Sequence, residues 1–186
     1  LLHMLGGLDT PSEGEVCIAG KNIAGMNREE LTIFRRRKVG FIFQSYNLVQ
    51  DLNVYENIVL PIRLDGKRVD RDFVEEIMQL LQINDKKQAL PGTLSGGQQQ
   101  RVAIARALAA KPQIILADEP TGNLDSVTSH EVMGLLKVVA KRYAQTIILI
   151  THDQDIAQMA DRIVRIEDGR IVSGNLGGKV GDHDAE

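Results

Sequence analysis

Two short apolar runs separated by a helical stretch constrain the fold of this chain most. Gln113–Asp118 (QIILAD) and Thr146–Thr151 (TIILIT) are nearly continuous apolar runs, which is typical of strands covered on both faces. A helical stretch, His130–Tyr143, lies between them. A strand, a helix and a second strand in this order need a crossover connection, which joins parallel strands. The pattern therefore predicts an α/β fold with a parallel sheet.

Further elements follow from the same kind of pattern. Short strands are expected at Glu15–Gly20, Val39–Phe43 and Arg162–Asp168, and an Asp-Gly turn within Glu167–Gly174 predicts a closing hairpin. Helices are expected in four segments: Arg28–Arg37, Asn53–Leu64 with Pro61 bending or ending it, Asp70–Ile83, and Ser95 to about Ala110.

These elements predict one domain over residues 1–174. Residues 1–43 and 111–174 would form the α/β core, and the mostly helical residues 44–110 an inserted helical subdomain. Residues 175–186 are polar and glycine-rich, so we expect a disordered tail.

Composition narrows the possible functions. The chain has 186 residues and a net charge of −3, which argues against broad nucleic-acid binding. The one basic cluster, Arg35–Lys38, is interpreted as a solvated helix end. Cys17 is the single cysteine, so no intrachain disulfide is possible. No apolar run approaches the roughly 18 to 20 residues that a membrane-spanning helix needs.

An acidic pair follows the first of the two apolar runs. Asp118 and Glu119 stand at the carboxyl end of this strand, where open α/β sheets bind ligands. An aspartate there can hold Mg²⁺, usually through water, and a neighbouring glutamate can polarise an attacking water. Taken alone, such a pair is more often a pair of loop carboxylates than a site.

The segment LSGGQQQR (Leu94–Arg101) is more specific. Ser95 is a natural N-cap, and the helix that follows points its N-terminal N–H groups at any phosphate in front of it. A capped helix after a turn explains Ser95. It does not explain Gly96 and Gly97, each of which costs about 1 kcal/mol in a helix relative to alanine. We interpret the two glycines as bare backbone that lets a phosphate approach.

Three more polar residues stand near predicted strand ends. Gln44 follows Val39–Phe43, His152 follows Thr146–Thr151, and Asp125 comes shortly after Glu119. Each has an ordinary interpretation, as a loop glutamine, a histidine at a helix entry and a helix cap. Their order along the chain nevertheless places polar groups where one ligand could touch them all.

At this point the chain resembles the ATP-binding cassette (ABC) ATPases, from Leu1 to about Val172. The resemblance rests on five motifs in order: FIFQ (Q-loop), LSGGQQQR (signature), IILADEP (Walker B), NLD (D-loop) and ITHD (switch histidine). Three segments are similar to sequences of one branch of the family: GGLDTPSEGEV, FQSYNLVQDLNVYENIVLP and ADEPTGNLDS. That branch serves lipoprotein release, macrolide export and antimicrobial-peptide resistance with FtsX-like permeases.

The resemblance implies ATP and Mg²⁺ as cofactors and a role for each motif residue. Glu119 would be the general base, and His152 would sense the γ-phosphate. Asp118 would hold the Mg²⁺ shell, with Gln44 beside it. The signature residues Ser95, Gly96, Gly97 and Gln98 would bind the nucleotide held by a second cassette.

The resemblance also implies the partners. Two copies would form a head-to-tail homodimer with Asp125 along its seam, and the dimer would bind an integral-membrane permease. Gln44 and the helical subdomain after it would connect the ATP state to that permease. The expected location is cytoplasmic, peripheral on the inner face of the cell membrane, with no nucleic-acid partner. Alternatives are an ABC ATPase outside transport and an inactive gene remnant.

One motif of the family is not in the chain. The phosphate loop G-x-x-x-x-G-K-[ST] is absent, since none of the Gly-Lys pairs at 20–21, 66–67 and 178–179 is followed by Ser or Thr. In the family this loop precedes a segment like LLHMLGG, which would be the rest of its helix. The resemblance thus implies a P-loop NTPase (RecA-like) core that is incomplete at its N-terminus. We expect residues 1–186 by themselves to be inactive.

Overall fold

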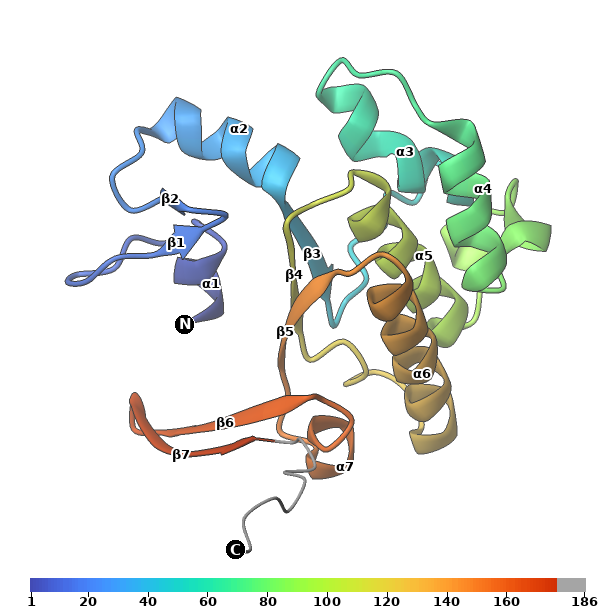
Figure 1. Ribbon diagram of the computed structural model, residues 1–186. Helices are drawn as coiled ribbons and strands as arrows, with labels where there is room; N and C mark the ends of the chain where they lie inside the picture. The colour runs from blue at the N-terminus through green and yellow to red at the C-terminus, as the bar shows by residue number, and fades with distance from the viewer. Residues whose placement is uncertain (177–186) are drawn as a thin grey trace, which may run out of the picture. The chain divides into compact units, whose positions relative to one another are not determined.

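The computed structural model describes residues 1–176 (Figure 1). The chain divides into two compact units, Leu1–Ile150 and the residues from Thr151 onward, and each is described by itself. The prediction of one domain over residues 1–174 stays a prediction.

A parallel sheet lies at the centre of the first unit. Its strands are β3 (Val39–Phe43), β4 (Ile114–Asp118) and β5 (Thr146–Ile150), in the order β3-β4-β5. Both pairings are parallel, and helix α6 (Ser126–Arg142) makes the crossover from β4 to β5. The predicted α/β fold with a parallel sheet is confirmed.

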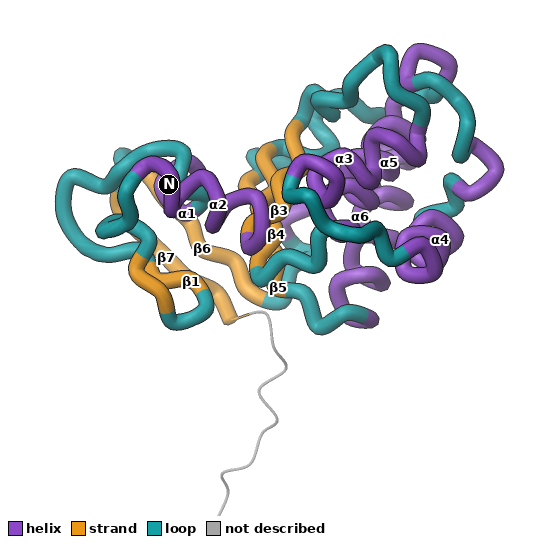
Figure 2. Tube along the Cα trace, turned by 90° about the horizontal axis from the view of Figure 1, so that it is seen from above, coloured by secondary structure: helices purple, strands orange, loops and turns teal. Residues whose placement is uncertain are grey.

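Helices cover both faces of this sheet, and Figure 2 shows α3, α4, α5 and α6 on one side with α1 and α2 on the other. The bounds are α1 Leu2–Leu5, α2 Arg28–Lys38, α3 Val54–Leu64, α4 Arg71–Leu80 and α5 Gly96–Ala109, with single 3₁₀ turns η1 at Asn84–Lys86 and η2 at Pro91–Thr93. Pro61 does not end α3, which continues to Leu64.

Side-chain caps explain why these helices start where they do. Asn27, Asn53 and Ser95 each form a capping box with the residue three positions on, and each cap accepts a backbone N–H of the first turn. Asp70 caps α4 by accepting the N–H of Phe73 at 3.2 Å. The cap positions fix the starts of all four helices that the sequence predicted in this region.

Alternation along β3 places neighbouring residues on opposite faces of the sheet. A Cβ on Gly40 would lie 2.9 Å from the backbone oxygen of Ala107 in α5, so only glycine allows this approach. On the other face, the Phe41 ring would lie 2.5 Å from a Cβ on Gly6, just after α1. Gly7, with φ +62°, follows the C-cap Gly6 of α1, and the N–H of Leu8 donates to the carbonyl oxygen of His3 at 2.8 Å, which closes the helix end.

The face covered by α1 and α2 also carries a small antiparallel pair, β1 (Cys17–Ile18) and β2 (Lys21–Asn22). Buried apolar residues from these elements and from the sheet form one cluster: Leu2, Ile18, Ile23, Phe34, Val39, Ile114 and Leu116. The first residues of the chain are therefore part of the core.

The second unit contains helix α7 (Gln154–Ala157) and a hairpin. Strands β6 (Arg162–Glu167) and β7 (Arg170–Leu176) pair antiparallel. Asp168 and Gly169 have φ values of +46° and +75°, as in the two-residue turns that favour Asp-Gly. This confirms the predicted hairpin. Residues 175 and 176 belong to β7 rather than to the expected tail, and the rest of that tail lies outside the described residues.

Among residues 1–176, no helix has the length and apolar character needed to cross a membrane.

Candidate active site

Strand register brings three predicted site residues, Gln44, Asp118 and Glu119, to one edge of the sheet. Phe43 pairs with Asp118, and Asp118 pairs with Ile150, so the three strands end side by side. Gln44 and Glu119 are the next residues after two of these ends. Gln44, Asp118 and Glu119 thus stand at the carboxyl edge of one sheet, and the prediction that one ligand touches them together with Asp125 and His152 stays a prediction.

Glu119 has an unusual backbone conformation. Its φ is +44°, in the left-handed region that side chains other than glycine rarely adopt. Two hydrogen bonds hold it there: its N–H donates to the Ile150 carbonyl oxygen at 2.9 Å, and its own carbonyl accepts the N–H of Gly122 at 3.0 Å. Strain of this kind costs roughly 1–3 kcal/mol and is concentrated at functional sites. The turn orients a half-buried carboxylate at the sheet edge.

The loop between β4 and α6, which contains Asn123, holds Gln44. Its Nε2 donates to Asn123 Oδ1 at 3.2 Å, and Asn123 Nδ2 donates back to the Gln44 carbonyl at 3.0 Å. A Cβ on Gly122 would lie 2.6 Å from Gln44 Nε2, so glycine is needed for this contact. The sequence analysis did not single out Asn123, although its place between Glu119 and Asp125 in TGNLD could have pointed to it.

The donor set at this edge suits Mg²⁺. This ion commonly takes one or two protein carboxylates and completes its shell with waters and phosphate oxygens. Asp118 offers a half-buried carboxylate at the end of β4, and Gln44 offers an amide oxygen at the adjacent position. Within the described residues, no group of three or more His, Cys, Asp or Glu side chains could hold a metal without such help.

The α5 N-terminus is built as the sequence predicted. Ser95 Oγ accepts the N–H of Gln98 at 3.3 Å, and Gln98 Oε1 accepts the N–H of Ser95 at 3.0 Å. The start of a 14-residue helix carries the positive end of its dipole, which favours a phosphate. The Gln98 side chain has a capping role here, and its predicted contact with nucleotide stays a prediction.

The two glycines of this first turn have a packing role that the sequence interpretation missed. A Cβ on Gly96 would lie 2.9 Å from Tyr46 Oη and 3.1 Å from Leu124, and one on Gly97 would lie 2.5 Å from Thr128 Cγ2. Close approach of α5 to α6 and to the Gln44 loop therefore accounts for both glycines without a phosphate. That a phosphate approaches these glycines stays a prediction, because packing alone is enough to explain them.

A pair of substitutions separates the two explanations. In a folded cassette, Gly97→Ala is expected to lower the free energy of unfolding by about 1–3 kcal/mol, because overpacking costs that much. Thr128→Ser removes Cγ2 and keeps the hydroxyl, so the double variant should recover most of this loss in a denaturant titration. A double variant as unstable as Gly97→Ala would contradict the packing role. Recovered stability without recovered ATP hydrolysis would identify a separate need for bare backbone at phosphate.

Asp125 acts as the N-cap of α6. Its carboxylate accepts the Thr128 N–H at 3.0 Å and the Thr128 hydroxyl at 2.6 Å, and these hydrogen bonds lower the pKa of Asp125. This is the ordinary interpretation that the sequence left open. Its predicted place on a dimer seam stays a prediction.

His152 is exposed and lies between β5 and α7. It belongs to the second unit, whereas Asp118 and Glu119 belong to the first. Its predicted role as a sensor of the γ-phosphate therefore stays a prediction.

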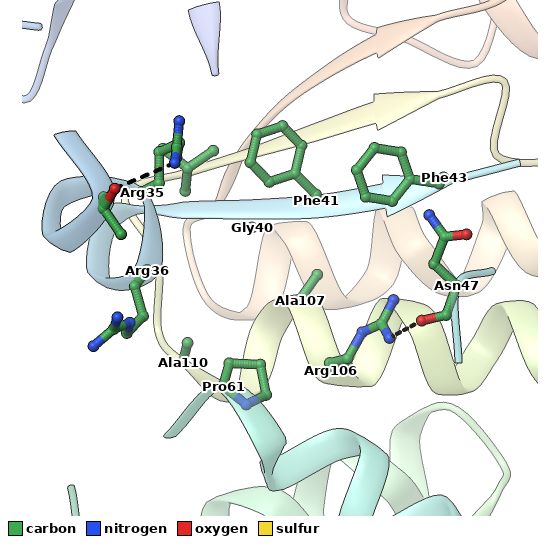
Figure 3. Close-up of a pocket in the computed structure, with 12 residues that line it drawn as sticks. Arg35, Arg36, Gly40, Phe41, Phe43, Asn47, Pro61, Arg106, Ala107 and Ala110 are labelled. Carbon is green, nitrogen blue, oxygen red and sulfur yellow. Dashed lines mark hydrogen bonds between the residues drawn. The ribbon is translucent and has the colours of Figure 1, made fainter. Parts of the chain in front are cut away.

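Two residues that the sequence analysis overlooked, Arg106 (Figure 3) and Asn57, hold the segment after Gln44. Arg106 of α5 donates to the backbone carbonyls of Tyr46 and Asn47 at 2.7 and 2.5 Å. Asn57 of α3 is fully buried and hydrogen-bonds the backbone of Val49 in both directions. The available signal was a polar side chain in an otherwise apolar helix stretch, AIARALA for one and ENIVL for the other.

Comparison with known proteins identifies the class to which this fold and site belong. The family model described as "ABC transporter" matches residues 1–122. The chain therefore belongs to the ABC transporter family, as an ATPase domain with the P-loop NTPase type of core.

Named relatives narrow the class further. The chain is 47% identical over 175 residues to the macrolide export ATP-binding/permease protein MacB of Photorhabdus laumondii, and the match covers 93% of the chain and 27% of MacB. It is 40% identical over 174 residues to the lipoprotein-releasing system ATP-binding protein LolD 1 of Chlorobium chlorochromatii, covering 92% of the chain and 71% of LolD 1. The resemblance to this branch is confirmed.

A solved structure agrees in fold. The cassette MJ0796, in a dimeric post-hydrolysis state bound to ADP and phosphate, superposes with a TM-score of 0.82 at 39% identity. The match covers 95% of the chain and 79% of MJ0796.

Proposed function

We propose that the chain is the ATP-hydrolysing subunit of an ABC transporter that works with an FtsX-like permease. The observation that carries this proposal is the common edge of β3 and β4, where Asp118 ends β4 and Gln44 and Glu119 directly follow the two aligned strand ends. The relatives named MacB and LolD 1 support the branch. Activity, substrate and permease of the whole protein are proposals, since the chain spans 27% of the length of MacB.

Each carboxylate has its own task in this proposal. Glu119 accepts a proton from the attacking water, and its constrained backbone keeps the carboxylate aimed at that water. Asp118 and Gln44 would hold the Mg²⁺ shell, and bound Mg²⁺ would neutralise charge on the transferring phosphoryl group. Phosphoryl transfer depends mostly on positioning and charge stabilisation, so groups fixed at a sheet edge suit it.

The signature segment would serve a second copy of the chain. Ser95, Gly96 and Gly97 stand at the start of α5, and in a head-to-tail dimer they would face the nucleotide of the partner. The dimeric state of MJ0796 supports this assignment. Asp125 at the start of α6 would lie along the seam, and His152 would sense the γ-phosphate.

The permease contact is proposed beside the Gln44 loop. A cavity of about 460 Å³ opens there between α2, β3, α3 and α5, and Asn47, Pro61 and Arg106 line it (Figure 3). A cytoplasmic helix of a permease seated in this region would touch the segment that follows Gln44. In this proposal the chain would lie at the inner face of a membrane without inserting into it.

Titration with Mg-ATP tests the proposal. The experiment uses a protein in which a phosphate loop and its strand precede residues 1–186, and we call this protein the complete cassette. It is expected to bind Mg-ATP with micromolar affinity and to hydrolyse it. Residues 1–186 by themselves should bind far more weakly, because the lysine and backbone N–H groups of the phosphate loop supply much of the phosphate contact. Calorimetry that gives micromolar affinity for residues 1–186 would contradict this account of the site.

A further inference from the structure

We propose that Arg106 is a positioning residue for ATP hydrolysis. Arg106 ties the loop that follows Gln44 to helix α5. Gln44 would then be in place for Mg²⁺ only when α5 is in its native position against the sheet. The inference rests on the proposed function, because Gln44 is assigned to the Mg²⁺ shell there.

The first step is the conformation of the loop. Tyr46 and Asn47 have φ values of +60° and +50°, so two consecutive residues other than glycine lie in the left-handed region. Such a turn does not persist by itself, and surrounding contacts must hold it. The turn comes two residues after Gln44, so its geometry sets the direction in which the chain leaves the sheet edge.

The second step is what holds the turn. Arg106 donates from two guanidinium nitrogens to the consecutive carbonyls of Tyr46 and Asn47, at 2.7 and 2.5 Å. In the described part of the chain these carbonyls, and no carboxylate, meet its charge, and burial lowers the pKa of the guanidinium. A planar fork with two donors fixes two carbonyls at once, which a lysine ammonium cannot do equally well.

The third step is the contact between the loop and the signature. The Tyr46 hydroxyl lies close enough to Gly96 that a Cβ there would be 2.9 Å away. The loop thus contacts α5 at two places: at Gly96, the first residue of the helix, and at Arg106, ten positions later. On its other side, Gln44 exchanges two hydrogen bonds with Asn123, four residues after Glu119.

These contacts form a continuous path from the start of α5, where the proposed function places the phosphate, to Gln44. Figure 3 shows the Arg106 guanidinium hydrogen-bonded to the Asn47 carbonyl, and both residues line the cavity beside β3. A displacement of α5 relative to the sheet carries Arg106 with it, and the Gln44 loop must follow or break its bonds. Arg106 therefore acts through Gln44 and need not touch the nucleotide.

A double-mutant cycle in the complete cassette tests this. Arg106→Gln should lower kcat and raise the Mg²⁺ concentration at half-maximal activity, each by about 10-fold, as for residues that orient a metal ligand. Gln44→Ala should have the same signature. In the Gln44→Ala background, Arg106→Gln should add little further loss, because both changes remove the same positioned amide. Arg106→Lys should fall between the parent and Arg106→Gln.

Arg142→Gln is the matched control. Arg142 is the last residue of α6, it is exposed, and its guanidinium donates to Glu76 of α4 at 2.7 Å. The variant removes the same charge away from the Gln44 loop and from the signature segment, so it should leave kcat and the Mg²⁺ dependence unchanged. If Arg106→Gln lowers kcat by the same factor with or without Gln44, or moves the Mg²⁺ dependence no more than Arg142→Gln, the positioning role is wrong.

Hydrogen exchange supplies a readout that does not depend on activity. Amides of residues 44–50 should exchange at least severalfold faster in Arg106→Gln, or in Arg106→Lys if the first variant does not fold, and not in Arg142→Gln. Unchanged exchange in this loop would overturn the inference. A parent cassette that hydrolyses no ATP while Arg106 variants still loosen the loop would instead contradict the proposed function alone.

Discussion

Glu119→Gln in the complete cassette is expected to lower kcat for ATP hydrolysis by about 10²- to 10⁴-fold, the usual effect of removing a general base. Glutamine keeps the size of the side chain and much of its hydrogen-bonding capacity but cannot accept the proton of the attacking water. The constrained turn at Glu119 should persist, because its hydrogen bonds to Ile150 and Gly122 use backbone atoms only. ATP should therefore stay bound and hold two cassettes together.

Asp118→Asn is the matched comparison for this prediction. It changes the adjacent carboxylate at the same sheet edge, and it should weaken Mg²⁺-dependent binding as well as turnover. Hydrolysis is measured by phosphate release and dimerisation by light scattering with ATP present. A near-parental rate for Glu119→Gln, or no ATP-dependent dimer, would show that the role assigned to Glu119 is wrong.

Asn57→Ala is expected to lower the free energy of unfolding of the complete cassette by about 2–5 kcal/mol, since each buried polar group left without a partner costs about 1–3 kcal/mol. The Asn57 side chain is fully buried. Its Oδ1 accepts the Val49 N–H at 2.8 Å, and its Nδ2 donates to the carbonyls of Val49 and Leu52 at 3.0 and 2.8 Å. These bonds hold the connection between the Gln44 loop and α3.

Asn22→Ala is the control for this change. Asn22 is exposed and accepts one backbone N–H, from Ala24 at 3.0 Å, so its loss should cost about 1 kcal/mol or less. Both variants are compared by chemical denaturation followed with circular dichroism. If Asn57→Ala is no less stable than Asn22→Ala, the buried amide does not hold this connection.

The strands and their common edge could be predicted from the sequence because continuous apolar runs such as Ile114–Asp118 need both faces covered. The crossover rule then makes neighbouring strands parallel, and parallel strands bring their carboxyl ends together. Helix starts were predictable for a similar reason, since caps such as Ser95 act within one turn of the chain. Local chemistry of this kind is visible in a single sequence.

Contacts between distant segments could not be predicted in this way. Arg106 meets Tyr46 across 60 positions, and Gln44 meets Asn123 across 79. A polar residue in an apolar helix stretch is the only local signal of such a partner, and it does not identify the partner, because such a residue can as well face solvent. The packing role of Gly97 could not be predicted for the same reason. The sequence shows a glycine that is costly in a helix, but it does not show that Thr128 fills the space beside it.

Mixing two inactive variants of the complete cassette tests the central claim, that Glu119 of one copy works with Ser95 of another. Glu119→Gln and Ser95→Arg are each expected to hydrolyse little ATP alone. Combined as ATP-free monomers and then given Mg-ATP, they should regain about a quarter of the parental rate, since half of the dimers formed at random would be mixed and each would hold one intact site. Recovery of this order would support a head-to-tail ATPase. A mixture no more active than its separate components would contradict it.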